Sequence, residues 1–224
     1  MTPRIISIEG NMGAGKTTFI KTLQDYFKNK CSIYILEEPV SLWQSIKDKE
    51  GNDILSNFYE DQTKWAFSFQ IMAFISRLTL LKQAIKDHPE SIIITERSVY
   101  SDRFIFAKML YDDKHICEID YQIYNKWFDN FIEDIPISSI IYLQCSPKIS
   151  EQRVLKRARK GEIIPLYYLI KCHAYHEKWL DTSKASSSSS PAIIKINCNN
   201  ENTAENIILW QKQVEQFILP LIKV

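Results

Sequence analysis

The glycine-rich stretch GNMGAGKTT at residues 10–18 limits the possible folds of this chain more than any other feature. It follows a β-branched run and matches the pattern G-x-x-x-x-G-K-[ST]. Such a loop needs backbone freed from Cβ atoms, because successive N–H groups converge on phosphate oxygens in front of a helix N-terminus. Lys16 then reaches the outer phosphates, and the Thr17 hydroxyl binds Mg²⁺. The stretch predicts a nucleoside triphosphate site formed by Gly10, Asn11, Met12, Gly13, Ala14, Gly15, Lys16, Thr17 and Thr18.

Short β-branched runs alternate with longer segments of helical character along the chain. The runs are at 4–9, 32–37, 91–96, 139–144 and 192–197. They are nearly continuous in Ile and Val, which is typical of parallel strands buried on both faces. Helices are predicted near 16–28, 61–87, 101–111, 119–132, 148–158, 166–181 and 203–219. This order predicts a single α/β domain over 1–224, a P-loop NTPase three-layer sandwich with a five-stranded parallel sheet flanked by helices.

Composition excludes several classes of protein. A hydrophobic content of 45% is ample for a core, and a net charge of +1 argues against a nucleic-acid-binding protein. The five cysteines are scattered without C-x-x-C spacing, which predicts free thiols in a reducing compartment. No signal-like segment is present and no apolar run approaches the roughly 20 residues of a membrane span. We expect a cytoplasmic protein without membrane contact, with a flexible serine-rich loop at 183–191.

Acidic residues follow two of the predicted strands: EEPVSLW (37–43) comes after the second and ERSVYSDRF (96–104) after the third. Carboxyl ends of parallel strands form the ligand edge of such a sheet. A carboxylate there can take a proton from an attacking hydroxyl, and another can hold Mg²⁺. Pro39 disfavours helix and is expected to keep Glu38 at the strand end. These features favour a small-molecule kinase over a solvated pair of glutamates.

Six motifs resemble, in order and spacing, those of the deoxynucleoside kinase family, which includes deoxycytidine, deoxyguanosine and mitochondrial-type thymidine kinases. They are GNMGAGKTT, EEPVSLW, FYEDQTKWAFSFQ, ERSVYSDRFIF, RVLKRARKGE and IPLYYLIKCHAYHEKWL. The resemblance runs from about residue 4 to residue 200. It implies ATP as the phosphate donor, Mg²⁺, a deoxynucleoside substrate in nucleotide salvage, and a homodimer built on two of the helices.

The resemblance also implies roles for the polar residues at the sheet edge. Glu38 corresponds to the family's catalytic base for the 5′-hydroxyl, and strand alternation is expected to turn Glu37 the other way. Glu96 corresponds to the Mg²⁺ ligand beside Thr17. Arg97 is expected close to the 5′-hydroxyl and the transferred phosphoryl group, since its fork of donors can bridge both.

The nucleoside pocket is expected along the helix at 61–87 and its neighbours. By family position, Tyr59 of the Phe58–Tyr59 pair bonds the sugar 3′-hydroxyl, Phe69 and Phe106 stack on the base, Gln70 pairs with it, and Trp43 closes the pocket. Ala73, Arg77 and Asp102 form the combination that resembles deoxycytidine and deoxyguanosine kinases. Asp102 can accept from an exocyclic amine or be held by Arg77, which crowds the space of a thymine methyl group. We therefore predict that deoxycytidine and purine deoxynucleosides are preferred to thymidine.

The charged stretch RVLKRARKGEIIP at 153–165 allows two interpretations. Its spacing predicts a helix that Gly161 and Pro165 end, and such a run is commonly an exposed face. The resemblance instead implies a lid over the donor phosphates. In that lid Arg153, Arg157 and Arg159 neutralise developing charge, and Glu162 reaches the 3′-hydroxyl beside Tyr59.

Other classes of protein share some of these features. A nucleoside monophosphate kinase has the same loop and an arginine lid, but it needs cations near its acceptor and no general base. A non-catalytic nucleotide-binding protein remains a second alternative. A GTPase is excluded because NKWF (125–128) fails the N-K-x-D pattern. His173 and His176, at i and i+3, lack a third metal ligand and are interpreted as helix-surface or core residues.

Overall fold

The computed structural model describes residues 4–132, 135, 137–158, 164–181, 191–200 and 203–222. Its centre is a five-stranded parallel sheet in the order β2-β3-β1-β4-β5. The strands are β1 (Arg4–Gly10), β2 (Ile33–Leu36), β3 (Ile92–Glu96), β4 (Ser139–Gln144) and β5 (Ala192–Asn197). The predicted parallel sheet is confirmed, with strand ends that differ from the prediction by at most one residue.

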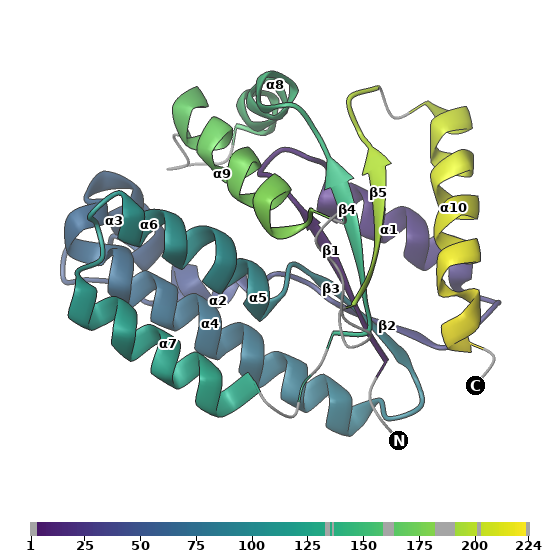
Figure 1. The fold of residues 1–224 in the computed structure, drawn as a ribbon, viewed down its shortest axis with the longest axis horizontal. Helices are drawn as coiled ribbons and strands as arrows, with labels where there is room; N and C mark the ends of the chain where they lie inside the picture. Colours follow the sequence, from purple (N-terminus) through teal and green to yellow (C-terminus); the bar gives the residue numbers. More distant parts are fainter. Residues whose placement is uncertain are drawn as a thin grey trace.

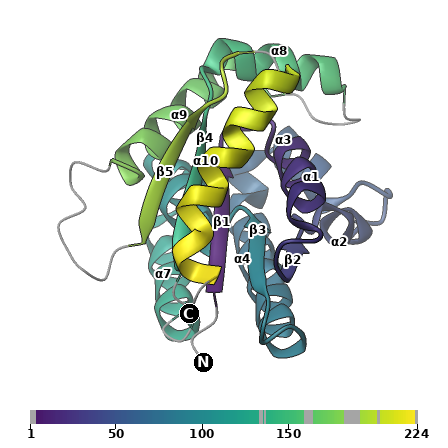
Figure 2. The ribbon, with the colours of Figure 1, turned by 90° about the vertical axis from the view of Figure 1, so that its right-hand side faces the viewer.

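Helices cover both faces of the sheet (Figures 1 and 2). On one face, α1 (Lys16–Phe27) and α10 (Ala204–Ile222) pack on strand residues such as Ile6 and Ile8. On the other face, α4 (Gln62–Asp87) and α7 (Glu118–Ile132) pack with strand residues such as Ile5 and Tyr142. The β1 isoleucines divide between these two apolar clusters, Ile5 on one face and Ile6 and Ile8 on the other, because a strand turns every second residue to the same face. The predicted three-layer sandwich is confirmed.

The remaining predicted helices are present with small differences. They are α8 (Pro147–Arg157) and α9 (Leu166–Trp179). The helix predicted at 101–111 is divided into α5 (Val99–Ser101), the π-helix η1 (Asp102–Ala107) and α6 (Lys108–Asp112). In this wider turn the Lys108 N–H donates to the carbonyl of Arg103, five residues back.

Two short helices were not predicted: α2 (Val40–Ser45) and α3 (Ile54–Glu60). Pro39 precedes α2 as its N-cap, although we expected it to disfavour helix. Proline restricts the residue before it, and its missing N–H costs nothing at a helix start. Glu38 accordingly stays outside the helix, as predicted. Asp53 begins α3, because its carboxylate accepts from the Ser56 N–H at 2.8 Å.

The charged stretch forms a shorter helix than its spacing predicts. Helix α8 ends at Arg157, and Ala158 takes a left-handed conformation with φ of 47°. Pro165 is the N-cap of α9, so it begins the next helix and does not end the previous one. Residues 159–163, with Arg159, Gly161 and Glu162, lie outside the described residues, as does most of the serine-rich loop.

Among the helices that the structure describes, none combines the length and the apolar composition that a bilayer-spanning segment requires.

His176 in α9 is a core residue. Its side chain is fully buried, stacks on Tyr142 with ring centroids 5.7 Å apart, and places Nδ1 2.6 Å from the Cys172 carbonyl oxygen. Burial lowers the pKa of His176 to about 3; the hydrogen bond to Cys172 opposes this change, and the charges of Arg97 and Lys16 add to it. The imidazole is therefore neutral in the folded protein near neutral pH.

We expect the free energy of unfolding to decrease as the pH falls below about 6.5. Below that pH the unfolded chain protonates His176, whereas the folded chain does so only near pH 3. The stabilisation from the neutral imidazole is complete above about pH 6.5. It decreases by up to about 1.4 kcal/mol per pH unit between about pH 6.5 and pH 3. Urea titrations at several pH values should give a steeper decline for the wild type than for His176→Gln. Parallel pH profiles of the two proteins would contradict this expectation.

Candidate active site

A cavity of about 340 Å³ opens at the carboxyl ends of β1, β2 and β3. Helices α2, α3 and α4 and the π-helix η1 enclose it. Of the predicted site residues, those that line it are Met12, Lys16, Thr17, Glu38, Trp43, Phe58, Tyr59, Phe69, Gln70, Ala73, Arg77, Glu96, Arg97, Asp102, Phe106 and Arg157. The fold thus brings one set of residues from six separate segments to a single cavity.

The phosphate loop takes the backbone conformation that its glycines allow. Gly13 and Gly15 have φ of 77° and 96°, and a Cβ atom on Gly13 would lie 2.3 Å from the Ser150 carbonyl oxygen. Lys16 folds back over the loop, and its Nζ lies 3.2 Å from the Gly10 carbonyl oxygen. Burial, and then the charge of Arg97, lower the pKa of Lys16 to about 7. The loop therefore has the form of an anion site next to a helix N-terminus.

Thr17 and Glu96 meet at the edge of the cavity. The Thr17 hydroxyl oxygen is 3.0 and 2.9 Å from the two carboxylate oxygens of Glu96. Hydroxyl and carboxylate oxygens are ligands that Mg²⁺ prefers, and this ion commonly takes one or two protein ligands together with substrate phosphates. Within the described ranges no cluster of three or more His, Cys, Asp or Glu residues could hold a metal alone. The pair fits Mg²⁺ bound jointly with a nucleotide.

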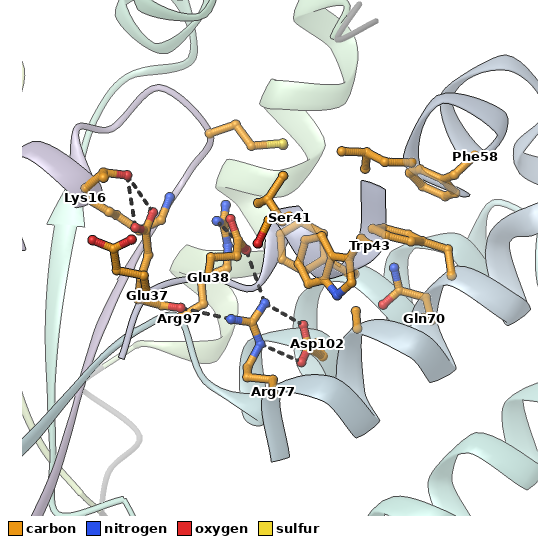
Figure 3. A pocket seen from close by; sticks show the side chains of 18 of the residues that line it. Lys16, Glu37, Glu38, Ser41, Trp43, Phe58, Gln70, Arg77, Arg97 and Asp102 are labelled. Carbon is orange, nitrogen blue, oxygen red and sulfur yellow. Dashed lines mark hydrogen bonds and ion pairs between the residues drawn. The ribbon is translucent and has the colours of Figure 1, made fainter. Parts of the chain in front are cut away.

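Glu38 lies between two arginines (Figure 3). Its Oε1 accepts from Arg77 Nη2 at 3.1 Å and from Arg97 Nη1 at 3.3 Å. Burial by itself raises the pKa of Glu38, but the charges of Arg97, Arg77 and Lys16 lower it to about 2. The carboxylate is therefore ionised at neutral pH and can accept a proton from a bound hydroxyl group.

Arg77 in α4 is held by three acceptors. Its Nε donates to Asp102 at 3.0 Å and its Nη1 to the Glu96 carbonyl oxygen at 2.9 Å, in addition to the bond to Glu38. Burial lowers the pKa of Arg77, but Asp102 and Glu38 together raise it above its ordinary value. Burial also raises the pKa of Asp102 to about 6, against the effect of Arg77. Asp102 is therefore held by Arg77, one of the two arrangements expected from the sequence.

Aromatic rings form the far end of the cavity. Phe58 stacks on Phe69 at 4.7 Å between centroids, and Trp43 meets Phe69 edge-on at 5.4 Å. The Trp43 indole donates to Ser76 at 2.9 Å, which fixes its plane. Gln70 is buried beside them, and its Oε1 has no hydrogen-bond partner among the described residues. An apolar slot with an unpaired amide oxygen suits a planar heterocycle with donors on its edge.

One sequence prediction about this site is wrong: Glu37 lines the same cavity as Glu38, because β2 ends at Leu36 and strand alternation no longer applies. Arg153 of α8 lies outside this cavity, as do most of the phosphate-loop residues. Its guanidinium donates to the Cys145 sulfur at 3.6 Å and to the Asn200 carbonyl oxygen at 3.1 Å, and its contact with the donor phosphates stays a prediction.

Several cavity residues were missed from the sequence. They are Val40, Ser41, Leu55 and Tyr168. The first three come from the two short helices that were not predicted. The aspartate N-cap at Asp53 was the one local signal that could have indicated α3.

Comparisons with known proteins agree with this geometry. A family model described as "Deoxynucleoside kinase" matches residues 6–219. The "Probable deoxycytidine kinase" of Fowlpox virus (strain NVSL) is 41% identical over 183 residues, which cover 80% of this chain and 72% of the relative. Human deoxycytidine kinase is 39% identical over 197 residues (78% and 74%), and human mitochondrial thymidine kinase 2 is 33% identical over 193 residues (85% and 69%). The chain therefore belongs to the deoxynucleoside kinase family, a family of phosphotransferases for which ATP is the implied phosphate donor.

Proposed function

We propose that this kinase transfers the γ-phosphoryl group of ATP to the 5′-hydroxyl of deoxycytidine and purine deoxynucleosides in preference to thymidine. The observation that carries this preference is the Arg77–Asp102 ion pair, which lies in the same cavity as the unpaired amide oxygen of Gln70. The catalytic residues are proposed from their positions in that cavity.

Glu38 is proposed as the general base. Its ionised carboxylate lies on the cavity wall between the phosphate loop and the aromatic slot, so a 5′-hydroxyl placed there can transfer its proton to Oε1. Lys16 and Arg97 lie on the phosphate side and would neutralise charge on the transferred phosphoryl group. Mg²⁺ held by Thr17 and Glu96 would supply further neutralisation of the donor phosphates when bound. Phe106 lies under the Arg97 guanidinium at 5.1 Å and helps to fix it.

The lid and the sugar contacts are proposed by analogy with the family. Arg157 at the end of α8 lines the cavity and is proposed to contact the donor phosphates. Tyr59 lines it too and is proposed to bond the 3′-hydroxyl. The roles of Arg159 and Glu162 remain predictions from the sequence, since both lie outside the described residues.

The base preference follows from the hydrogen-bonding groups on the edge of each base and from the partners that the cavity offers them. Cytosine and adenine present an exocyclic amine beside a ring acceptor, and Gln70 offers the matching amide oxygen and amide N–H. Asp102, buried beside Arg77, supplies a second acceptor for an amine. Thymine has no amine and carries a methyl group, for which the fixed Arg77 side chain leaves less room.

A substrate panel tests this preference. With ATP and Mg²⁺, we expect kcat/KM for deoxycytidine and at least one purine deoxynucleoside to exceed that for thymidine by at least about tenfold, in the range expected for one rejected group. Including dCMP distinguishes a nucleoside monophosphate kinase, for which dCMP would be the better acceptor. Thymidine as the best substrate would contradict the preference while leaving the family assignment intact.

We further propose that two copies associate through the outer face of α4 and α7, which lie side by side in Figure 1. Apolar residues recur every fourth position along α7 and are solvent-exposed: Ile119 by 69%, Ile123 by 41%, Trp127 by 47% and Phe131 by 40%. Ile75 of α4, 44% exposed, adds to the apolar surface of these two helices. An apolar stripe of this kind on a folded domain is typical of a protein interface.

Light scattering after gel filtration tests the association. The wild type should have about twice the chain mass of 26.3 kDa. Trp127→Glu should shift the mass to that of a monomer, whereas Leu209→Glu should remain a dimer, because Leu209 is 53% exposed on α10, which covers the opposite face of the sheet from α7. A monomeric wild type, or a Trp127→Glu variant that stays dimeric, would contradict this interface.

A further inference from the structure

Arg97 occupies a strained backbone position. It lies in the turn between β3 and α5 and has φ of 62°, in the left-handed region that residues with a side chain seldom adopt. Its N–H donates to the Ile8 carbonyl oxygen at 3.0 Å. Strain of this kind persists only where surrounding contacts hold it, and it concentrates at functional sites. From this conformation the guanidinium reaches Glu38 at 3.3 Å and the Gly10 carbonyl oxygen at 3.4 Å.

The next residue, Ser98, ties this turn to a buried carboxylate. The Ser98 hydroxyl donates to Glu9 Oε1 at 2.6 Å, and Ser7 donates to the same oxygen. Glu9 and Ser7 are fully buried, and Ser98 is 4% exposed. Glu9 precedes the phosphate loop directly, so the bond joins the start of that loop to the Arg97 turn across 89 residues of chain.

Glu9 is costly as a purely structural residue. Its Oε2 is buried and has no hydrogen-bond partner among the residues that the structure describes. A buried carboxylate with an unpaired oxygen destabilises a fold, so folding alone gives no reason for this side chain. It does not line the cavity.

We infer that Glu9, acting through the Ser98 hydroxyl, is a positioning residue that holds Arg97 in the left-handed conformation required for phosphoryl transfer. This inference rests on the proposed role of Arg97. When the hydrogen bond between Ser98 and Glu9 is lost, the turn can relax to an ordinary backbone conformation. The Arg97 guanidinium then moves away from Glu38 and the phosphate loop. Displacements of about 1 Å at a reacting group can cost on the order of a hundredfold in rate, whereas nucleoside binding in the aromatic slot is unaffected.

The role of the Ser98–Glu9 hydrogen bond is tested by steady-state kinetics with ATP and the best nucleoside of the substrate panel. Ser98→Ala should lower kcat at least tenfold and change the nucleoside KM less than twofold. The matched control is Ser7→Ala, which removes a hydroxyl from the same Glu9 oxygen but does not touch the Arg97 turn; its kcat should stay within threefold of the wild type. Glu9→Gln keeps an acceptor oxygen for Ser98 and should also stay within threefold, whereas Glu9→Leu should lose at least tenfold.

A double-mutant cycle separates positioning from a structural effect. If Ser98 acts through Arg97, then Arg97→Ala/Ser98→Ala should be no slower than Arg97→Ala alone. The inference would be overturned if Ser98→Ala slowed the wild type and Arg97→Ala by the same factor. It would also be overturned if Ser98→Ala kept kcat within threefold of the wild type while Arg97→Ala was slow. Either result would leave the proposed function standing. If Arg97→Ala itself keeps the wild-type kcat, the proposed role of Arg97 is wrong and the inference is wrong with it. Should Glu9→Leu not fold, the serine variants decide the outcome.

Discussion

Replacing Glu38 with Gln is expected to lower kcat by about 10² to 10⁴-fold, the range that a positioned general base contributes. The amide has the same shape but does not accept the hydroxyl proton. The Kd of the nucleoside should change only a few-fold, because the aromatic slot and Gln70 are untouched. Since the pKa of Glu38 is lowered to about 2, the wild-type rate should not fall through protonation of this group anywhere near neutral pH.

The chain offers a matched control for this variant in the neighbouring carboxylate. Glu37 lines the same cavity and is exposed, and within the described ranges it forms no ion pair with Arg77 or Arg97. Glu37→Gln should therefore keep kcat within about tenfold, below the contribution of a general base. Single-turnover kinetics measure the chemical step directly. A Glu38→Gln enzyme with normal turnover, or a greater loss in Glu37→Gln, would contradict the assignment of the base.

Replacing Arg77 with Met is expected to lower the free energy of unfolding by about 3 to 5 kcal/mol. The guanidinium is buried and donates to Asp102, Glu38 and the Glu96 carbonyl oxygen. Its loss leaves the Asp102 carboxylate, 2% exposed, without its cation. The double variant Arg77→Met/Asp102→Asn should recover part of the loss, because the uncompensated buried charge is then absent.

Urea unfolding of these variants measures the effect, with a surface ion pair as the control. Lys108 pairs with Asp112, both side chains are 37% exposed, and Lys108→Met should cost no more than about 1 kcal/mol. Equal losses in Arg77→Met and Lys108→Met would show that the buried pair contributes nothing beyond a surface contact. No recovery in the double variant would show that the cost lies in packing rather than in the buried charge.

Some of the fold and site could be predicted because the signal was local. The phosphate loop, the β-branched runs and α4 each carry their information in consecutive residues or in one repeating period. The short helices α2 and α3 have too few residues to show a period, so they were missed, and with them part of the cavity wall. The π-helix η1 has no period that distinguishes it from an ordinary helix in sequence.

Site residues that act through distant partners were harder to place. The sequence around Arg153 gives no sign of its contacts with a sulfur just after β4 and with a carbonyl beyond β5. Glu37 was assigned to the wrong side because the end of β2 could not be placed to one residue. Such outcomes depend on which groups approach one another after folding, and no local pattern contains that information.

The phosphate loop, the parallel sheet and the chemical types of the residues at its ligand edge can be derived from the amino-acid sequence, because each depends on neighbours along the chain. The pairing of these residues follows only from the folded arrangement. That arrangement places Arg77 between Glu38 and Asp102, and it joins Glu9 to the Arg97 turn through Ser98. Such pairing escapes the sequence because hydrogen bonds and charge pairs act over a few ångströms in space, between residues that the chain separates by 25 to 89 positions.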